Sequence, residues 1–391
     1  MPFSLFKKEK ENTLLIFDIG NGSVGGALVR KIIDKEGVMS LKITASERVE
    51  VPLKERVNFD NLLKNISKAT GVVAERLSQK TEARNFLTAY AVLASPWHAS
   101  RTKIVTLKKD GPFVFTKKLQ DEILAKEMAF FKNEISAKNS DTPHEFSAIE
   151  SNIINISLNG YNTSAPFDKE VNEASLAIYL TVSQKRVLSA IDDKIKTFFP
   201  RAEVSFHSFP LAYFVAIRDI FPRKNDFLTI DVSGEITDVS LARGGILIET
   251  HSFPLGRNFF FRRAALTAGK TLDQAMSLHA MFTENVLSKK DKDEFAKAIS
   301  EAKAEWLWSF RKAIADLSGN LYTPGEIFLT ADNDISNLFT SWISEEEFSQ
   351  HSFSHQKFNV ISFLSGSKNA GNDQFLDIIA LFAQKFTEKR P

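Results

Sequence analysis

The chain has 391 residues, of which 43% are hydrophobic, so it can bury a sizeable core in two or more compact units. Its 50 basic and 48 acidic side chains leave a formal net charge of +2, and this disfavours a nucleic-acid partner, which requires concentrated positive charge. It contains no cysteine, which excludes disulfide scaffolds, thiolate zinc sites and cysteine nucleophiles, and we expect a cytoplasmic protein.

The first residues, MPFSLFKKEKEN, combine apolar side chains with lysines. They allow at most a weak contact with a membrane surface, and we favour an ordinary polar terminus. The next apolar run, residues 14–17, ends at Asp18 and is too short for a signal-peptide core or a membrane span.

Strands and helices alternate at the start of the chain. Residues 14–17 and 27–33 are predicted strands on either side of a glycine-rich turn, because apolar and β-branched residues gather there. The apolar spacing over residues 61–76 predicts an amphipathic helix, and residues 86–93 a buried strand. This alternation predicts an α/β fold.

Residues 95–172 differ in character and predict a small α+β unit inserted into the first domain. We expect strands over residues 103–107, 113–115 and 149–158, and a helix over residues 119–135. The first domain, residues 12–94, is then expected to resume over residues 173–224, with a strand over 174–182 and a helix over 185–198.

A second hairpin, FLTIDVSGEITDVSLARGG over residues 227–245, aligns on the first without gaps. Asp231 falls on Asp18, and Gly234 falls on Asn21. The long interval between the two excludes a solenoid repeat and predicts a duplicated α/β domain over residues 225–391. Its expected elements are helices over 272–282, 292–304, 305–317 and 374–386, a strand over 327–330, and a helical subdomain over about 258–323.

The two hairpins together predict a phosphate clamp. Small turn residues let backbone N–H groups approach phosphate oxygens, and Asp18 and Asp231 could hold a hydrated Mg²⁺ against them. One such hairpin is usually only a hairpin, but two, each placed first in an α/β domain, favour the functional interpretation. The other candidate ligands are Gly20, Asn21, Gly22 and Ser23 in the first hairpin, and Ser233, Gly234, Thr237 and Asp238 in the second.

Four segments resemble motifs of the actin-like ATPase superfamily, within it the FtsA and PilM type. DIGNGSVGGALV and DVSGEITDVSLARGG are similar to its two phosphate motifs, HSFPLGRNFFFRRAAL to the segment that follows the second, and EIFLTADNDISNLF to its adenosine motif. The inserted unit looks like the SHS2 subdomain of this type. The resemblance implies duplicated actin-like, ribonuclease H-like domains with ATP and Mg²⁺ between them, and it adds Gly256, His279, Asp332 and Asn333 as nucleotide contacts.

The same resemblance implies a scaffold with protein partners. An inner-membrane or cytoskeletal protein would place a peptide in the cleft beside the SHS2-like unit. Self-association, a role in type IV pilus assembly or cell division, and a position at the inner face of the cell membrane are further expectations.

The motifs also depart from the family pattern. Gly25 stands where PilM-like sequences have a phosphate-binding lysine, and Ser233 replaces a glycine. Met276 and His279 replace the Glu and Lys of an EAExxK helix, and residues 331–333 replace three glycines under adenine. A lost charged contact weakens binding by about 1.5 to 3 kcal/mol, so four departures can turn a micromolar site into a millimolar one.

Two functions therefore remain open. One is a scaffold that binds ATP·Mg²⁺ weakly and is at most a slow ATPase. The other is a nucleotide-free pseudo-ATPase that serves purely as an interaction platform. A sugar or acetate kinase is disfavoured, because no substrate-specific constellation is evident, and we assign no catalytic residue.

Three other features receive structural interpretations. His351 and His355 have a spacing that could bind a metal on one helix face, but without a third ligand we expect a solvated surface. Trp306 and Trp308 are expected in the core or an interface, because no basic groove accompanies them. The FFFRR run, residues 259–263, is expected to pack under the second hairpin.

Overall fold

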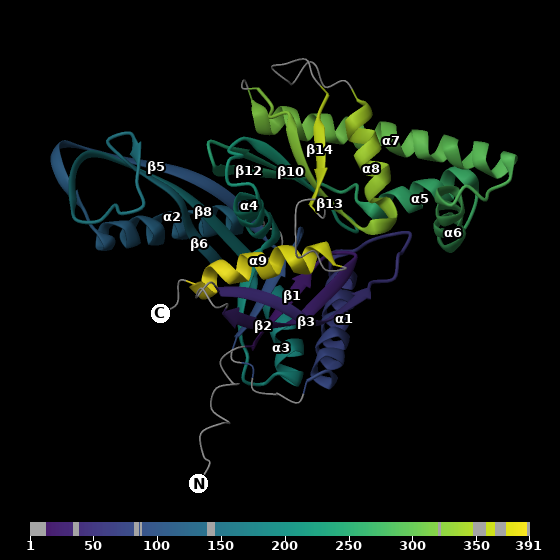
Figure 1. The fold of residues 1–391 in the computed structure, drawn as a ribbon, viewed down its shortest axis with the longest axis horizontal. Helices are drawn as coiled ribbons and strands as arrows, with labels where there is room; N and C mark the ends of the chain where they lie inside the picture. The colour runs from purple at the N-terminus through teal and green to yellow at the C-terminus, as the bar shows by residue number, and fades with distance from the viewer. Residues whose placement is uncertain are drawn as a thin grey trace, which may run out of the picture.

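The computed structural model describes residues 13–33, 39–81, 86, 88–138, 145–319, 322–346, 357–363 and 373–388. These residues form three β-sheets with helices around them (Figure 1). The N-terminal segment and the pair His351 and His355 lie outside the described residues. No helix of the described ranges is both long and apolar enough to cross a membrane.

The first sheet has the strand order β3-β2-β1-β4-β9. Its strands are β1 (Thr13–Ile19), β2 (Ser23–Ile33), β3 (Met39–Glu50), β4 (Thr88–Leu93) and β9 (Glu203–Ser208). β1, β2 and β3 are antiparallel, whereas β1, β4 and β9 are parallel. The helices α1 (Phe59–Gln79) and α3 (Lys185–Phe198) cover one face, because their apolar stripes pack on inward-facing residues of β1 such as Phe17.

The second sheet repeats this plan. Its order is β12-β11-β10-β13-β14, with β10 (Phe227–Val232), β11 (Thr237–Arg243), β12 (Ile246–Phe253), β13 (Glu326–Ala331) and β14 (Asn359–Ser362). The strand directions match those of the first sheet position by position. The predicted duplication is confirmed.

Helices of the second half are α5 (Arg257–Ala268), α6 (Leu272–Thr283), α7 (Lys289–Ser318) and α8 (Asn333–Glu345). The two helices predicted over residues 292–304 and 305–317 are wrong, since α7 runs through both. No glycine or proline separates them, so nothing ends the helix at that point.

Two further helices, α4 (Phe209–Ile220) and α9 (Gln374–Glu388), lie between the two sheets (Figure 1). One continuous apolar cluster contains Ile16 of β1, Phe227 of β10 and Phe382 of α9. The two halves of the chain therefore share a core and are not joined only by a linker.

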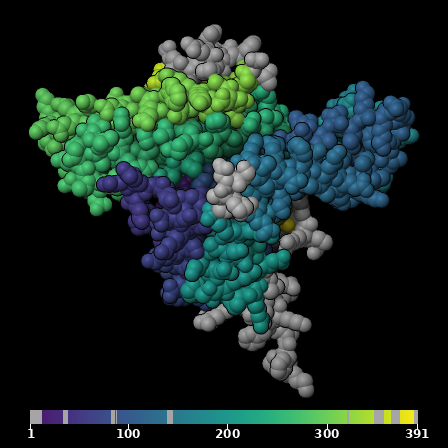
Figure 2. Space-filling view, turned by 180° about the vertical axis from the view of Figure 1, so that it is seen from behind, coloured from purple at the N-terminus to yellow at the C-terminus, as the bar shows by residue number. Residues whose placement is uncertain are grey.

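The inserted unit is a four-stranded antiparallel sheet, β5-β8-β6-β7, with one helix on it. Its elements are β5 (Ala99–Phe115), α2 (Lys117–Lys138), β6 (Phe146–Leu158), β7 (Tyr161–Asn162) and β8 (Lys169–Gln184). Residues 174–182, expected to resume the first α/β pattern, instead continue β8 between β5 and β6. Figure 2 shows this unit as a lobe that projects from the rest of the molecule.

Candidate functional site

The two predicted hairpins occupy equivalent places in the two sheets. In the first, Asp18 of β1 lies opposite Gly25 of β2, and in the second, Asp231 of β10 lies opposite Asp238 of β11. Asp18 and Asp231 are each 4% exposed. Each sits near the end of a buried strand, where the following turn residues reverse the chain.

The turns of the two hairpins touch each other. A Cβ atom placed on Gly22 would lie 2.7 Å from the Cα atom of Gly234, and one placed on Gly234 would lie 2.4 Å from the Cα atom of Gly22. These positions accept only glycine, because any side chain would clash with backbone. The glycines here bring one hairpin against the other and leave no gap between the turns for a polyphosphate.

The side chain of Asn21 stabilises this contact through hydrogen bonds. It is fully buried, and its Nδ2 donates to the Ser95 carbonyl oxygen at 2.6 Å and to the Ser233 Oγ at 2.8 Å. Its Oδ1 accepts the backbone N–H of Glu235 at 2.6 Å. Two of these three hydrogen bonds cross between the halves of the chain, so the candidate ligands Asn21 and Ser233 already satisfy one another.

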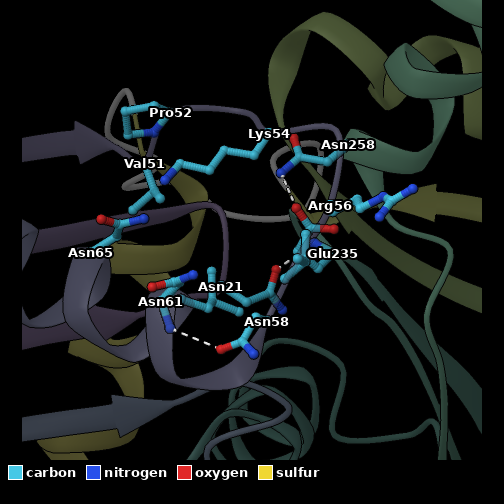
Figure 3. A pocket seen from close by; sticks show the side chains of 12 residues that line it. Asn21, Val51, Pro52, Lys54, Arg56, Asn58, Asn61, Asn65, Glu235 and Asn258 are labelled. Atoms are coloured by element: carbon cyan, nitrogen blue, oxygen red, sulfur yellow. Dashed lines mark hydrogen bonds between the residues drawn. The ribbon is translucent and has the colours of Figure 1, made fainter.

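The contact region between the two hairpins, called the seam below, continues beside the turns at Glu235 and Asn258 (Figure 3). Asn258 Nδ2 donates to Glu235 Oε1 at 2.7 Å, and Arg262 Nη2 donates to Glu235 Oε2 at 2.5 Å. Gly256 lies directly under the second hairpin, since a Cβ atom there would be 2.3 Å from the Ser233 carbonyl oxygen. The cavity that remains along this seam has a volume of about 20 Å³.

Arg48 of β3 forms ion pairs with two aspartates of the site, Asp18 and Asp373. Its Nη2 lies 2.8 Å from Asp18 Oδ2, its Nε lies 2.7 Å from Asp373 Oδ2, and its Nη1 donates to Ser23 Oγ at 2.7 Å. Asp373 also accepts the N–H groups of Phe375 and Leu376, both at 3.2 Å, at the start of α9. One guanidinium thus joins the first hairpin, β3 and the N-terminus of α9.

Gly25 makes room for this arginine. It lies opposite Arg48 in the β2–β3 ladder, and a Cβ atom on it would be 2.6 Å from Arg48 Nη2 and 2.9 Å from its Cζ. The cation expected from a lysine at position 25 is therefore supplied by the neighbouring strand. It points at Asp18, the residue predicted to hold Mg²⁺.

Among the residues that the structure describes, no basic side chain takes the corresponding place beside Asp231 of the second hairpin. Burial raises the pKa of Asp231 well above its usual value, and the adjacent Asp238 adds to the shift. Burial likewise raises the pKa of Asp238, whose Oδ1 accepts from Ser252 Oγ at 2.5 Å. Asp231 Oδ1 accepts from Thr330 Oγ1 at 2.9 Å.

The site as a whole does not fit ATP with Mg²⁺. The cavity between the hairpins, which Asp18, Arg48, Asp231 and Asp332 help to line, has a volume of about 20 Å³. Pockets for small ligands usually measure about 300 to 1,000 Å³.

Two of the expected nucleotide contacts, His279 and Asn333, lie apart from this closed region. His279 and Asn333 line a separate cavity of about 520 Å³ with Phe261, Met276 and Asn337. His279 Nε2 lies 2.7 Å from the Asp334 carbonyl oxygen, so this nitrogen carries the proton. The cavity on the predicted nucleoside side is therefore far larger than the one between the hairpins.

Asp332 lies at the rim of the site, at the N-terminus of α8. Arg257 is 3.6 Å from it and 2.6 Å from Asp334, and both pairs tie α5 to α8. Burial raises the pKa of Asp332 to about 6, against the opposing charge of Arg257.

The remaining predicted residues have structural contacts. Thr237 is fully buried, and its Oγ1 donates to the Leu255 carbonyl oxygen at 2.7 Å. The same Oγ1 accepts a hydrogen bond from Trp306 Nε1 at 3.2 Å. Trp306 belongs to the core as expected, whereas Trp308 is 65% exposed. Phe260 and Phe261 are buried in the core of the second half, as predicted for the FFFRR run.

Arg48 and Asp373 were missed at the sequence level. Residues 41–49, LKITASERV, alternate apolar and polar side chains and so carried a strand signal that would have placed Arg48 beside β2. Asp373 carries no such signal, because its role depends on a contact with a residue 325 positions away.

Comparison with known proteins supports the fold. No protein-family model and no curated protein matches the chain. Among solved structures, PilM in a PilM–PilN type IV pilus biogenesis complex aligns with a TM-score of 0.60 at 12% identity, covering 95% of this chain and 98% of that chain. The ethanolamine utilization protein EutJ from Carboxydothermus hydrogenoformans aligns with a TM-score of 0.44 at 12% identity, over 94% and 89%. Apo ParM from psk41 aligns with a TM-score of 0.41 at 11% identity, over 97% and 98%.

Proposed function

We propose that this chain, which has the actin-like ATPase fold seen in PilM, is a scaffold protein that works without bound nucleotide. Of the two functions that the sequence left open, this one has the stronger support. The observation that carries it is the position of Arg48, which neutralises Asp18 in a cleft where the two hairpins meet. The chain's own residues hold the two halves together where a polyphosphate and its metal would otherwise do so.

The cost of admitting a nucleotide follows from these contacts. Separating the hairpins breaks the two hydrogen bonds of Asn21 that cross between the halves, and freeing Asp18 for a metal also requires Arg48 to leave it. At about 0.5 to 1.5 kcal/mol for each hydrogen bond and about 3 to 5 kcal/mol for the ion pair, the sum is roughly 4 to 8 kcal/mol. This is an upper bound, since separated groups regain water, yet it is comparable with the roughly 8 kcal/mol of a micromolar complex.

The role of the scaffold belongs to the same proposal. The likeness to PilM favours type IV pilus assembly over cell division, with the protein at the inner face of the cell membrane. A peptide of an inner-membrane partner would lie in the cleft between the first sheet and the inserted unit. A pull-down that recovers a PilN-like membrane protein supports this role, whereas recovery of an FtsZ-like tubulin supports division.

Thermal unfolding with and without ATP·Mg²⁺ tests the nucleotide-independent part. A ligand at one hundred times its Kd stabilises a protein by about 2.7 kcal/mol, which is readily measured. We expect no change in Tm at millimolar nucleotide. Stabilisation that disappears in Asp18→Asn and Asp231→Asn would instead support the weak ATP-binding scaffold.

A further inference from the structure

A large groove runs between α1 and α3, on the face of the first sheet opposite α4 and α9. Its volume is about 810 Å³, far more than that of the closed cavity between the hairpins. Figure 2 shows this part of the surface, with α1 in dark blue beside α3 in teal. Neither the hairpins nor the second sheet contributes a residue to it.

The floor of the groove is made of small and apolar side chains. Ser67 and Ala190 bring the two helices close, with Ser67 Oγ donating to the Ala190 carbonyl oxygen at 3.0 Å. Leu63, Val72 and Phe198 are half-buried along the same floor. Such a surface can accept the apolar stripe of another helix.

The centre of the groove is basic. Lys64 and Lys68 lie one turn apart on α1, and Lys194 faces them from α3. All three side chains are exposed, and within the described ranges none has an ion-pair partner. The acidic residues of α1 lie near the two ends of the groove. Asp60, at one end, forms an ion pair with Arg186 at 2.6 Å, and Glu75 lies at the other end.

We propose that this groove binds an amphipathic helix of a partner protein, with acidic side chains beside its apolar stripe. The lining residues of α1 run from Asp60 to Glu75, which at 1.5 Å per residue corresponds to a partner helix of about 15 residues. The three lysines would meet acidic side chains at its centre, and Glu75 would meet a basic one near one end. A flat anionic membrane fits less well, because the surface is concave and carries carboxylates toward both ends.

Fluorescence anisotropy with the full chain tests the proposal. The probe is a fluorescein-labelled helical peptide of about 15 residues, with leucines on one face and glutamates beside them. Its matched control peptide has lysines in place of the glutamates. The test variant is Lys64→Glu/Lys68→Glu, and the control variant is Lys290→Glu/Lys297→Glu, which reverses two exposed charges on α7.

We expect the acidic peptide to bind roughly tenfold more tightly than the lysine peptide, with an affinity that falls as salt rises. The Lys64→Glu/Lys68→Glu variant is expected to lose this preference, while the control variant keeps it. Equal binding of the two peptides, or equal behaviour of the two variants, overturns the proposal. So does binding to phosphatidylglycerol vesicles that requires Lys64 and Lys68 when the acidic peptide does not bind.

Discussion

Replacing Arg48 by methionine tests how much its ion pairs with Asp18 and Asp373 stabilise the fold. The substitution keeps an unbranched apolar stem but removes the guanidinium, whose Cζ lies 5.2 Å from the ring centroid of Phe375. It removes the cation from Asp18 and Asp373, whose side chains are 5% and 18% exposed. Removing one partner of a buried ion pair costs about 3 to 5 kcal/mol.

We expect a value near the lower end, about 3 kcal/mol, because Asp18 can take up a proton once the arginine is gone. Burial already raises its pKa despite the opposing charge of Arg48. For a large domain, each 1 kcal/mol lowers Tm by about 2 to 4 °C, so the expected fall is about 6 to 12 °C.

Urea and thermal unfolding, followed by circular dichroism, measure this loss. Lys42→Met is the matched control, because Lys42 lies on the same strand, is exposed and has no ion-pair partner within the described ranges. The double variant Asp18→Asn/Arg48→Met is expected to recover about half of the loss, since the buried charge is removed together with its partner. A Tm for Arg48→Met that equals that of Lys42→Met would refute the reasoning.

Three other substitutions test the same site. Asn21→Ala removes three hydrogen bonds and is expected to cost about 2 to 4 kcal/mol in urea unfolding; a loss below about 1 kcal/mol would mean that the hairpins are not fastened there. Gly22→Ala forces a clash with Gly234 and is expected to cost about 1 to 3 kcal/mol, whereas Gly111→Ala, with open space around it, leaves Tm unchanged. The raised pKa of Asp332, about 6, means that the folded chain binds more protons than the unfolded chain between about pH 4 and 6, so stability falls as pH rises through this range. Asp332→Asn is expected to flatten that part of the pH–stability profile, and an unchanged slope would assign it to other groups.

Much of the architecture could be predicted because its signals are local. The hairpin at Asp18 and its repeat at Asp231 each combine an apolar run with a polar turn, and the two agree position by position. The helix over residues 61–76 has a clear apolar stripe and lies within α1. Local pattern also explains the errors, because a long helix such as α7 and a long strand such as β8 continue without a sequence signal at the expected breaks.

The chemistry of the site could be predicted less well. The resemblance implied that Gly25 stands in the place of a lysine, but the sequence does not show that Arg48 lies beside Gly25 from the next strand. The contact between Gly22 and Gly234 likewise depends on how the two halves pack. Both facts are tertiary, and together they give a closed contact between the halves of the chain where the sequence predicted a phosphate clamp.

Hydrogen exchange at the two hairpins tests the central claim most directly. Backbone amides of residues 20–23 and 233–236 are measured by mass spectrometry with and without millimolar ATP·Mg²⁺. Because the hairpins contact each other and the Glu235 N–H is bonded to Asn21, we predict slow exchange without nucleotide and no change when it is added. Fast exchange that becomes slow on addition of ATP·Mg²⁺ would contradict the account, since it would show an open cleft that nucleotide closes.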